Sequence, residues 1–391
     1  MAAYPGKYPV TAAPCSLYVH IPFCAAKCDY CDFYSIPPGE LTIDRYLESL
    51  HAQTRRLVES AGQSACIIPS VYIGGGTPSM LTGDEITRVL SIIKSCEESC
   101  APGAGEAREV TVEANENAGE AFLESCRRAG VTRLSLGVQS FDTQCREGAG
   151  RRTRLDGVFR AARFWIESAG KLSLDLMTGL PSQTEDTVKR DIAGALSLGA
   201  THISLYALTV EPGTLALRNA PPAEAAEKMW LAGRDELAAC GFDQYEISNF
   251  AAGPHDRCLH NIRYWRMENW LGAGPSASGT LFDDENGTAL RLRYSSSLEE
   301  FLSLAPPERE EIDAATLMKE SIMMGYRYKE GPDKALFQKR FKRSIDELIP
   351  AALKKWKNND ERFTFLNRFL LDAFTELDQR TNSQARLRIE D

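Results

Sequence analysis

The stretch YVHIPFCAAKCDYCDFYS, residues 18–35, determines how the rest of this sequence is interpreted. It places three cysteines, Cys24, Cys28 and Cys31, at spacings of four and three residues, directly after a β-prone run. Disulfide frameworks use cysteines in pairs, and structural zinc sites use four ligands. A [4Fe–4S] cluster held by three thiolates leaves one iron open to a small molecule. The spacing therefore favours an iron–sulfur cluster.

Two other interpretations of the three cysteines stay open from the spacing alone. One is a zinc site completed by His20 or Cys15, and the other is a set of thiols with no shared role. The chain has 391 residues and 11 cysteines, and its start has no apolar segment like that of a secretory signal. We therefore expect a reducing, cytoplasmic environment, where clustered thiols more often bind metals than form disulfides.

Composition and charge narrow the class of protein. Hydrophobic residues make up 43% of the chain and charged residues 25%, which is ordinary for a soluble globular protein. No apolar run approaches the length that a membrane-spanning helix needs. The formal net charge of −9 argues against broad nucleic-acid binding, because such binding needs a basic surface.

Short β-prone runs alternate with amphipathic helical stretches in the first half of the chain. This alternation predicts a parallel sheet with right-handed crossovers, and six units are two fewer than a complete eight-unit barrel. We therefore expect an α/β fold with a partial (β/α)6 barrel, and a doubly wound open sheet is the alternative. The expected strands are 16–22, 70–76, 109–115, 133–139, 172–181 and 202–209.

Composition shifts divide the chain into parts. We expect a flexible tail at 1–14, a core barrel at 15–250, a connecting segment with the motif HNIRYW at 251–297, and a small, mostly helical C-terminal domain at 298–391. The basic run QKRFKR, 338–343, predicts a solvated helix face. Docking of this run onto a partner or an acidic membrane surface is left open.

Polar residues stand at the carboxyl ends of the expected strands, where parallel β/α folds bind ligands. The cysteines follow the first strand and GGGTP, 74–78, ends the second. Glu113 ends the third strand, Gln139 ends the fourth, and Asp175 lies within the fifth. A charge in the apolar run around Asp175 is costly without a partner, so we expect one. Together these residues predict one binding site.

The pattern C-x3-C-x2-C after YVHIPF resembles the radical SAM superfamily. More narrowly, the chain resembles the family of oxygen-independent coproporphyrinogen III oxidase (HemN) and its relative, the heme chaperone HemW. The matching motifs include YVHIPFCAAKCDYCDF, YIGGGTPS, RLSLGVQSF, LDLMTGLPSQT, QYEISNFA and HNIRYW. The resemblance implies a [4Fe–4S] cluster on the three cysteines, with S-adenosylmethionine (SAM) on the open iron.

The family's motifs also imply a set of SAM-binding residues. Glycine has no Cβ, so GGGTP can present bare backbone to a ligand, and the resemblance places this backbone near the methionine amino group. Arg152 competes with Arg151 for the role of the cofactor-contacting arginine. The implied residues are Tyr18, Phe33, Gly75, Gly76, Thr77, Glu113, Gln139, Arg151 and Asp175.

The chain departs from the family pattern at two positions near this site. Glu116 stands where the family usually has a proline after the third strand, and Thr153 stands where the chaperone branch usually has a histidine. Neither position is a cluster ligand. The two departures affect how closely this chain matches the family around the cofactor and the substrate.

Two features favour the chaperone branch over the oxidase branch. The oxidase has a further cysteine where this chain has Phe33, and it has a longer N-terminal region. In HNIRYW, His260 is the candidate heme ligand, because imidazole is a common protein ligand of heme iron and the chaperone branch links this motif to heme. Cys258 is the alternative ligand.

The resemblance implies a radical SAM protein that binds heme and hands it to acceptors such as respiratory hemoproteins. Whether it cleaves SAM as an enzyme is left open, and so is a homodimer. The alternatives are oxidative decarboxylation of coproporphyrinogen III, a radical SAM methyltransferase-like tailoring activity, and a zinc-bound interaction module.

Overall fold

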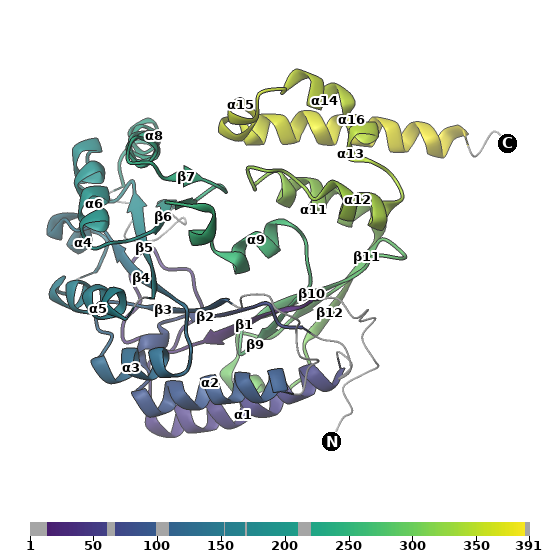
Figure 1. The fold of residues 1–391 in the computed structure, drawn as a ribbon. Helices are drawn as coiled ribbons and strands as arrows, with labels where there is room; N and C mark the ends of the chain where they lie inside the picture. Colours follow the sequence, from purple (N-terminus) through teal and green to yellow (C-terminus); the bar gives the residue numbers. More distant parts are fainter. Residues whose placement is uncertain are drawn as a thin grey trace.

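The first six strands form the parallel part of one sheet (Figure 1). A computed structural model describes residues 14–60, 67–98, 109–151, 153–168, 170–209 and 220–387, so nearly all of the expected tail lies outside the described residues. The strands are consecutive neighbours, as a partial (β/α)6 barrel requires, which confirms the predicted fold class. They are β1 (Ser16–Ile21), β2 (Ser70–Gly75), β3 (Glu109–Ala114), β4 (Arg133–Gln139), β5 (Lys171–Thr178) and β6 (His202–Ala207).

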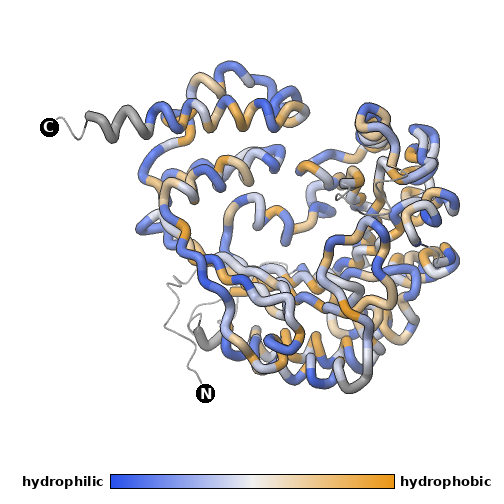
Figure 2. The backbone as a smooth tube through the Cα atoms, turned by 180° about the vertical axis from the view of Figure 1, so that it is seen from behind, coloured by the Kyte–Doolittle hydropathy of each residue, from blue (hydrophilic) through white to orange (hydrophobic). Residues whose placement is uncertain are grey.

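Amphipathic helices cover the outer face of this sheet. In the first helix, Tyr46, Leu47 and Leu50 are buried against the strands, because residues three and four apart lie on one helix face. Figure 2 shows the same division, with hydrophilic stretches on the outer turns of the helices. The helices are α1 (Glu40–Ser60), α2 (Gly83–Glu98), α3 (Glu120–Arg128), α4 (Thr143–Gly148), α5 (Asp156–Glu167), α6 (Glu185–Ser197) and α8 (Ala223–Ala239).

The sheet continues on both sides of the six parallel strands, which the sequence did not predict. The described strands follow the order β12-β11-β10-β9-β1-β2-β3-β4-β5-β6-β8-β7. On one side β9 pairs in parallel with β1, and on the other β8 pairs antiparallel with β6. The added elements are β7 (Asp243–Gln244), β8 (Asn249–Ala251), α9 (Leu259–Trp265), β9 (Trp270–Ala273), β10 (Ser278–Asp283), β11 (Thr288–Arg293) and β12 (Glu308–Ile312).

The C-terminal helices pack around a second hydrophobic core, in which Leu317, Leu348 and Phe369 are fully buried. Phe282 and Ala289, from β10 and β11, belong to the same core, so the sheet and this helical region are joined by packing. The helices are α10 (Leu298–Leu302), α11 (Ala314–Gly325), α12 (Lys334–Phe341), α13 (Ile345–Leu348), α14 (Pro350–Lys355), α15 (Asn359–Thr364) and α16 (Leu366–Leu387).

The basic run 338–343 is only partly the solvated helix face that its sequence predicts. The Arg340 side chain is 3% exposed, because it donates to the Asp284 carboxylate at 2.9 Å and lies 4.2 Å from the centre of the Phe282 ring. Lys339 is exposed and pairs with the same carboxylate. Arg340 therefore anchors α12 to β10.

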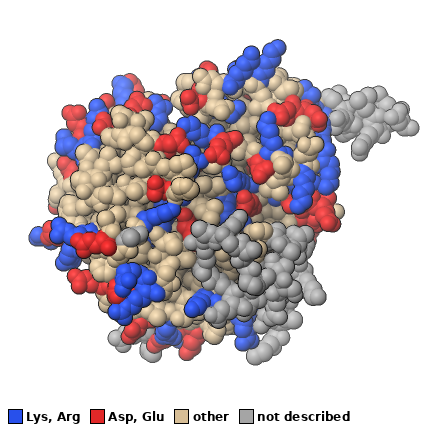
Figure 3. Space-filling model, viewed as in Figure 1, with Lys and Arg blue, Asp and Glu red and all other residues tan. Residues whose placement is uncertain are grey.

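Charged side chains of both signs are interspersed over the described residues on the face in Figure 3. None of the helices in the described ranges is long and apolar enough to cross a membrane.

Candidate functional site

The three cysteines lie on the loop between β1 and α1, and their thiols are free and partly exposed. The two ends of this loop are held together, because Phe23 and Ile36 form a β-bridge and the Cys24 N–H donates to the Ile36 carbonyl at 2.9 Å. The Cys31 N–H donates to the Cys28 carbonyl at 3.1 Å. A fixed loop therefore presents three accessible thiols at the carboxyl end of β1.

The cluster on these three thiols stays a prediction. In the parts of the chain that the structure describes, no three His, Cys, Asp or Glu side chains gather around one ion position. Thiolates of a [4Fe–4S] cluster bind different irons, so they need not meet at one point.

Neither of the two residues considered as a fourth zinc ligand is available to the three cysteines. The ring nitrogens of His20 are both engaged, with the Tyr18 hydroxyl at 3.1 Å and the Tyr34 carbonyl at 3.0 Å. Cys15 is buried at the start of β1, at the opposite end from the loop. His20 instead joins β1 to the cysteine loop, a role that the sequence analysis missed.

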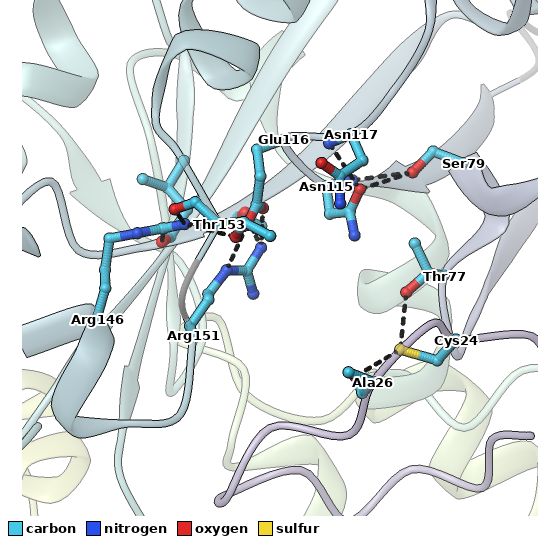
Figure 4. A network of polar contacts seen from close by, with 12 residues as sticks. Cys24, Ala26, Thr77, Ser79, Asn115, Glu116, Asn117, Arg146, Arg151 and Thr153 are labelled. Carbon is cyan, nitrogen blue, oxygen red and sulfur yellow. Dashed lines mark hydrogen bonds and ion pairs between the residues drawn. The ribbon is translucent and has the colours of Figure 1, made fainter. Parts of the chain in front are cut away.

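The glycines of GGGTP bring β2 into direct contact with the cysteine loop. A Cβ on Gly76 would lie 2.8 Å from the Phe23 carbonyl oxygen, and a Cβ on Gly75, whose φ is +114°, would lie 2.7 Å from the His20 ring. Only glycine permits both approaches. Thr77 follows, and its hydroxyl lies 3.4 Å from the Cys24 sulfur (Figure 4). The predicted glycines and Thr77 therefore lie beside the predicted cluster ligand.

Polar side chains from β1, β2 and β3 meet on the inner face of the barrel. The rings of Tyr18 and Tyr72 are stacked with centroids 6.3 Å apart. The Tyr72 hydroxyl donates to one Glu113 carboxylate oxygen at 2.9 Å, and the Gly75 N–H donates to the other at 3.1 Å. Burial, reinforced by the nearby Asp175 carboxylate, raises the pKa of Glu113 to about 7. Near neutral pH this group can therefore gain or lose a proton.

The predicted partner of Asp175 is present. The Ser135 hydroxyl donates to this carboxylate at 3.2 Å, and burial raises the pKa of Asp175. Gln139 ends β4 with a φ of +69°, in the left-handed region, next to a register shift between β4 and β5. Such a conformation costs energy in a non-glycine residue and is common at binding sites. Asp175 and Gln139 thus stand on the strands that follow Glu113 in the sheet.

Arg151 lies 3.4 Å from the Tyr30 hydroxyl on the cysteine loop, and its guanidinium is held by a carboxylate (Figure 4). Its guanidinium donates to Glu116 through two nitrogens and to the Gly137 carbonyl at 2.7 Å. Arg146 donates to the same carboxylate at 2.9 Å and to the Thr153 hydroxyl at 3.1 Å. The two departures from the family pattern, Glu116 and Thr153, therefore belong to one network.

The role of two other candidate positions stays a prediction. Arg152, the competitor of Arg151, lies outside the described residues. Phe33 is 62% exposed on the cysteine loop, so its contact with the cofactor stays a prediction.

His260 lies outside the set of predicted cofactor residues, although its ring centroid is 5.3 Å from that of Tyr72. It lies on α9, on the inner face of the sheet near the start of β2, and is 1% exposed. Its ring nitrogens engage the Ser70 hydroxyl at 3.0 Å and the Tyr264 hydroxyl at 2.8 Å. Burial, with Arg263 nearby, lowers the pKa of His260 to about 3, so the imidazole is neutral. Cys258 is buried as well, and burial raises its pKa.

Both candidate heme ligands are therefore interior groups at the end of the strands remote from the cysteines. Ligation of heme by His260 stays a prediction, and it requires α9 to separate from its hydrogen-bonding partners.

Comparison with known proteins decides the family. The Radical SAM superfamily matches residues 18–193. Heme chaperone HemW from Bacillus subtilis is 32% identical over 352 residues, which cover 87% of this chain and 90% of the relative. The chain belongs to the HemW family of radical SAM proteins. Heme chaperone HemW from Escherichia coli is 37% identical over 278 residues, which cover 69% of this chain and 71% of that protein.

A solved structure supports the fold of this HemW-family chain. Coproporphyrinogen III oxidase (HemN) from Escherichia coli, a radical SAM enzyme, superposes with a TM-score of 0.76 at 19% identity, covering 94% of this chain and 91% of that one. This likeness shows a shared fold, including the helical C-terminal region.

Proposed function

We propose that this chain binds a [4Fe–4S] cluster through Cys24, Cys28 and Cys31, binds SAM at the open iron, and carries heme to acceptor hemoproteins such as respiratory ones. The observation that carries the proposal is the match to a heme chaperone over 87% of this chain and 90% of that relative. Phe33, at the position of the oxidase's further cysteine, supports the chaperone branch.

The chain's own residues would bind and orient SAM. The backbone at Gly75 and Gly76 permits close approach, the Glu113 carboxylate offers a negative charge for an ammonium group, and Asp175 suits a ribose hydroxyl. When bound, the reduced cluster supplies the electron that breaks a carbon–sulfur bond of SAM. Binding alone is sufficient for a chaperone in which the cluster and SAM govern heme transfer or oligomeric state.

His260 is the proposed heme ligand, and Cys258 is the alternative. Because His260 is buried, the proposal requires α9 to open before the imidazole reaches iron. We place the protein in the cytoplasm; membrane contact and a homodimer are not required.

An anaerobic heme titration of the cluster-reconstituted protein, followed by Soret absorbance, tests this function. His260→Ala is compared with Ser70→Ala, which removes a hydrogen bond of the same imidazole but keeps the ligand. Saturable, near-stoichiometric binding that weakens in His260→Ala and is retained in Ser70→Ala supports the chaperone with His260 as ligand. Equal heme binding by the wild type and both variants would show that His260 is not the ligand. Cys258→Ala would then be the next variant to test.

Absence of specific heme binding in the wild-type protein would refute the chaperone proposal. The alternative function is then that of a coproporphyrinogen III oxidase, because the chain shares its fold with HemN. Formation of protoporphyrinogen IX from coproporphyrinogen III under anaerobic conditions, with CO2 released from the propionates, would establish it.

A further inference from the structure

One carboxylate holds two guanidinium groups at the edge of the barrel where the cysteine loop lies. Glu116 contacts Arg151 through both carboxylate oxygens and contacts Arg146 at 2.9 Å (Figure 4). The side chains of Glu116 and Arg146 are each 2% exposed, and that of Arg151 is 11% exposed. Buried charges of this kind are retained only with well-placed partners, so the geometry of the three groups is mutually determined.

The backbone of Glu116 is itself fixed from two sides. The Asn115 side chain accepts the Asn117 N–H at 2.9 Å, and the Ser79 hydroxyl accepts the Asn115 N–H at 3.1 Å. On the other side, a Cβ on Gly157 would lie 1.7 Å from the Glu116 carbonyl oxygen, so α5 packs directly against this carbonyl. Glu116 therefore has little freedom, and the carboxylate that it presents is preorganised.

Arg151 connects this fixed carboxylate to the cysteine loop. Its guanidinium also donates to the Gly137 carbonyl on β4 and lies 3.4 Å from the hydroxyl of Tyr30, which stands between Cys28 and Cys31. The two-point contact with Glu116 sets the plane of the guanidinium, because a carboxylate and a guanidinium pair best when coplanar. The orientation of Arg151 toward the loop is thus determined by Glu116.

The charges show that Glu116 does not cancel the positive character of the site. Two guanidinium groups and one carboxylate leave one excess positive charge. Burial alone would raise the pKa of Glu116, but the hydrogen bond and charge of Arg151 hold it below its ordinary value. The carboxylate therefore stays ionised at neutral pH and positions Arg151, while the three groups together keep one positive charge.

We propose that Glu116 is a positioning residue for SAM binding, which acts by fixing the Arg151 guanidinium in the orientation that contacts the cofactor. This inference rests on the proposed binding of SAM. It assigns a role to a residue that the sequence shows only as a departure from the family pattern.

The test measures the SAM dissociation constant of the reconstituted full-length protein by anaerobic equilibrium dialysis. The variants are Glu116→Gln, Arg151→Gln and the double variant, and iron content and thermal unfolding are recorded for each. Asp156→Asn is the matched control, because it removes a carboxylate from an exposed ion pair with Arg154 at the start of α5. We expect Glu116→Gln to weaken SAM binding about tenfold and Asp156→Asn to change it less than twofold.

The double variant separates positioning from a general structural effect. Without Arg151, Glu116 has nothing to position, so the double variant should bind SAM within twofold of Arg151→Gln. It also keeps one excess positive charge, as in the wild type, so it answers the question even where Glu116→Gln alone does not fold. A structural role would persist in the Arg151→Gln background, because Arg146 still loses its partner.

Two results would overturn the inference. One is unchanged SAM affinity in Glu116→Gln, and the other is a double variant tenfold weaker than Arg151→Gln. No SAM binding by the wild-type protein would instead overturn the proposed cofactor role, and this inference with it.

Discussion

Replacing Glu113 by glutamine should make the ligand-free protein more stable in a pH-dependent way. The carboxylate lies deep in the barrel near Asp175, and its pKa is raised from the ordinary 4.5 to about 7. Between these values the folded protein binds a proton that the unfolded chain has released. The contribution of Glu113 to wild-type stability is therefore largest below pH 4.5, falls as the pH rises, and levels off above pH 7. Glutamine has no such titration.

The size of the effect follows from the two pKa values. Each pH unit between them costs the wild type about 1.4 kcal/mol, so the stability advantage of Glu113→Gln should grow by about 2.5 kcal/mol from pH 5 to pH 8. The hydrogen bonds from Tyr72 and Gly75 favour the ionised carboxylate, so their pH-dependent part is already contained in the shifted pKa, and the pH-independent cost of altering them cancels in the difference. The difference between pH values is therefore the quantity to measure.

Urea unfolding of full-length protein without SAM, at pH 5 and pH 8, provides the comparison. Glu246→Gln is a positive control, because burial also raises the pKa of Glu246 to about 7, outside the candidate site. Exposed Glu227 provides the negative control as Glu227→Gln. Parallel stability profiles for wild type and Glu113→Gln would refute the reasoning. Loss of SAM binding in Glu113→Gln, with binding kept in Glu246→Gln, would connect the buried charge to the cofactor.

Other substitutions test separate contacts. Gly76→Ala should abolish stable cluster binding, measured as iron per chain, because its Cβ would meet the Phe23 carbonyl at 2.8 Å. His260→Ala should lower the free energy of unfolding by about 2–4 kcal/mol, because it leaves a cavity and unpaired hydroxyls. Arg340→Ala should cost about 2–4 kcal/mol in the same assay, whereas exposed Lys339→Ala should stay within about 0.5 kcal/mol.

The parallel strands could be predicted because each has several apolar residues followed by a helical period. The same signal is absent from β9, which has four residues including Gly272, and from β7, which has two. β9 pairs with the edge that β1 leaves open, and β7 pairs with β8, which itself adds to the open edge of β6. Strand addition of this kind depends on contacts between distant residues, so no local pattern reveals it.

In the candidate site, too, local sequence patterns predict some residues and miss contacts between distant ones. Glu113, Gln139 and Asp175 could be placed because strand ends meet at one edge of a parallel sheet. The contacts of Glu116 with Arg146 and Arg151 could not, because they span 30 and 35 residues and depend on loop conformation. The residue type and motif of His260 are typical of a heme ligand, but its surroundings are those of a buried structural residue. Only the structure distinguishes these two roles.

The place of β1 in the sheet has a consequence for synthesis on the ribosome. One edge of β1 pairs with β2 soon after both emerge, but its other edge pairs with β9, about 250 residues later in the chain. At 5–20 residues per second, the nascent chain carries this strand edge unpaired for roughly 12–50 s. An open strand edge is a site for wrong pairing between chains. Protection of the nascent chain during that interval should therefore govern how much protein is recovered in native form.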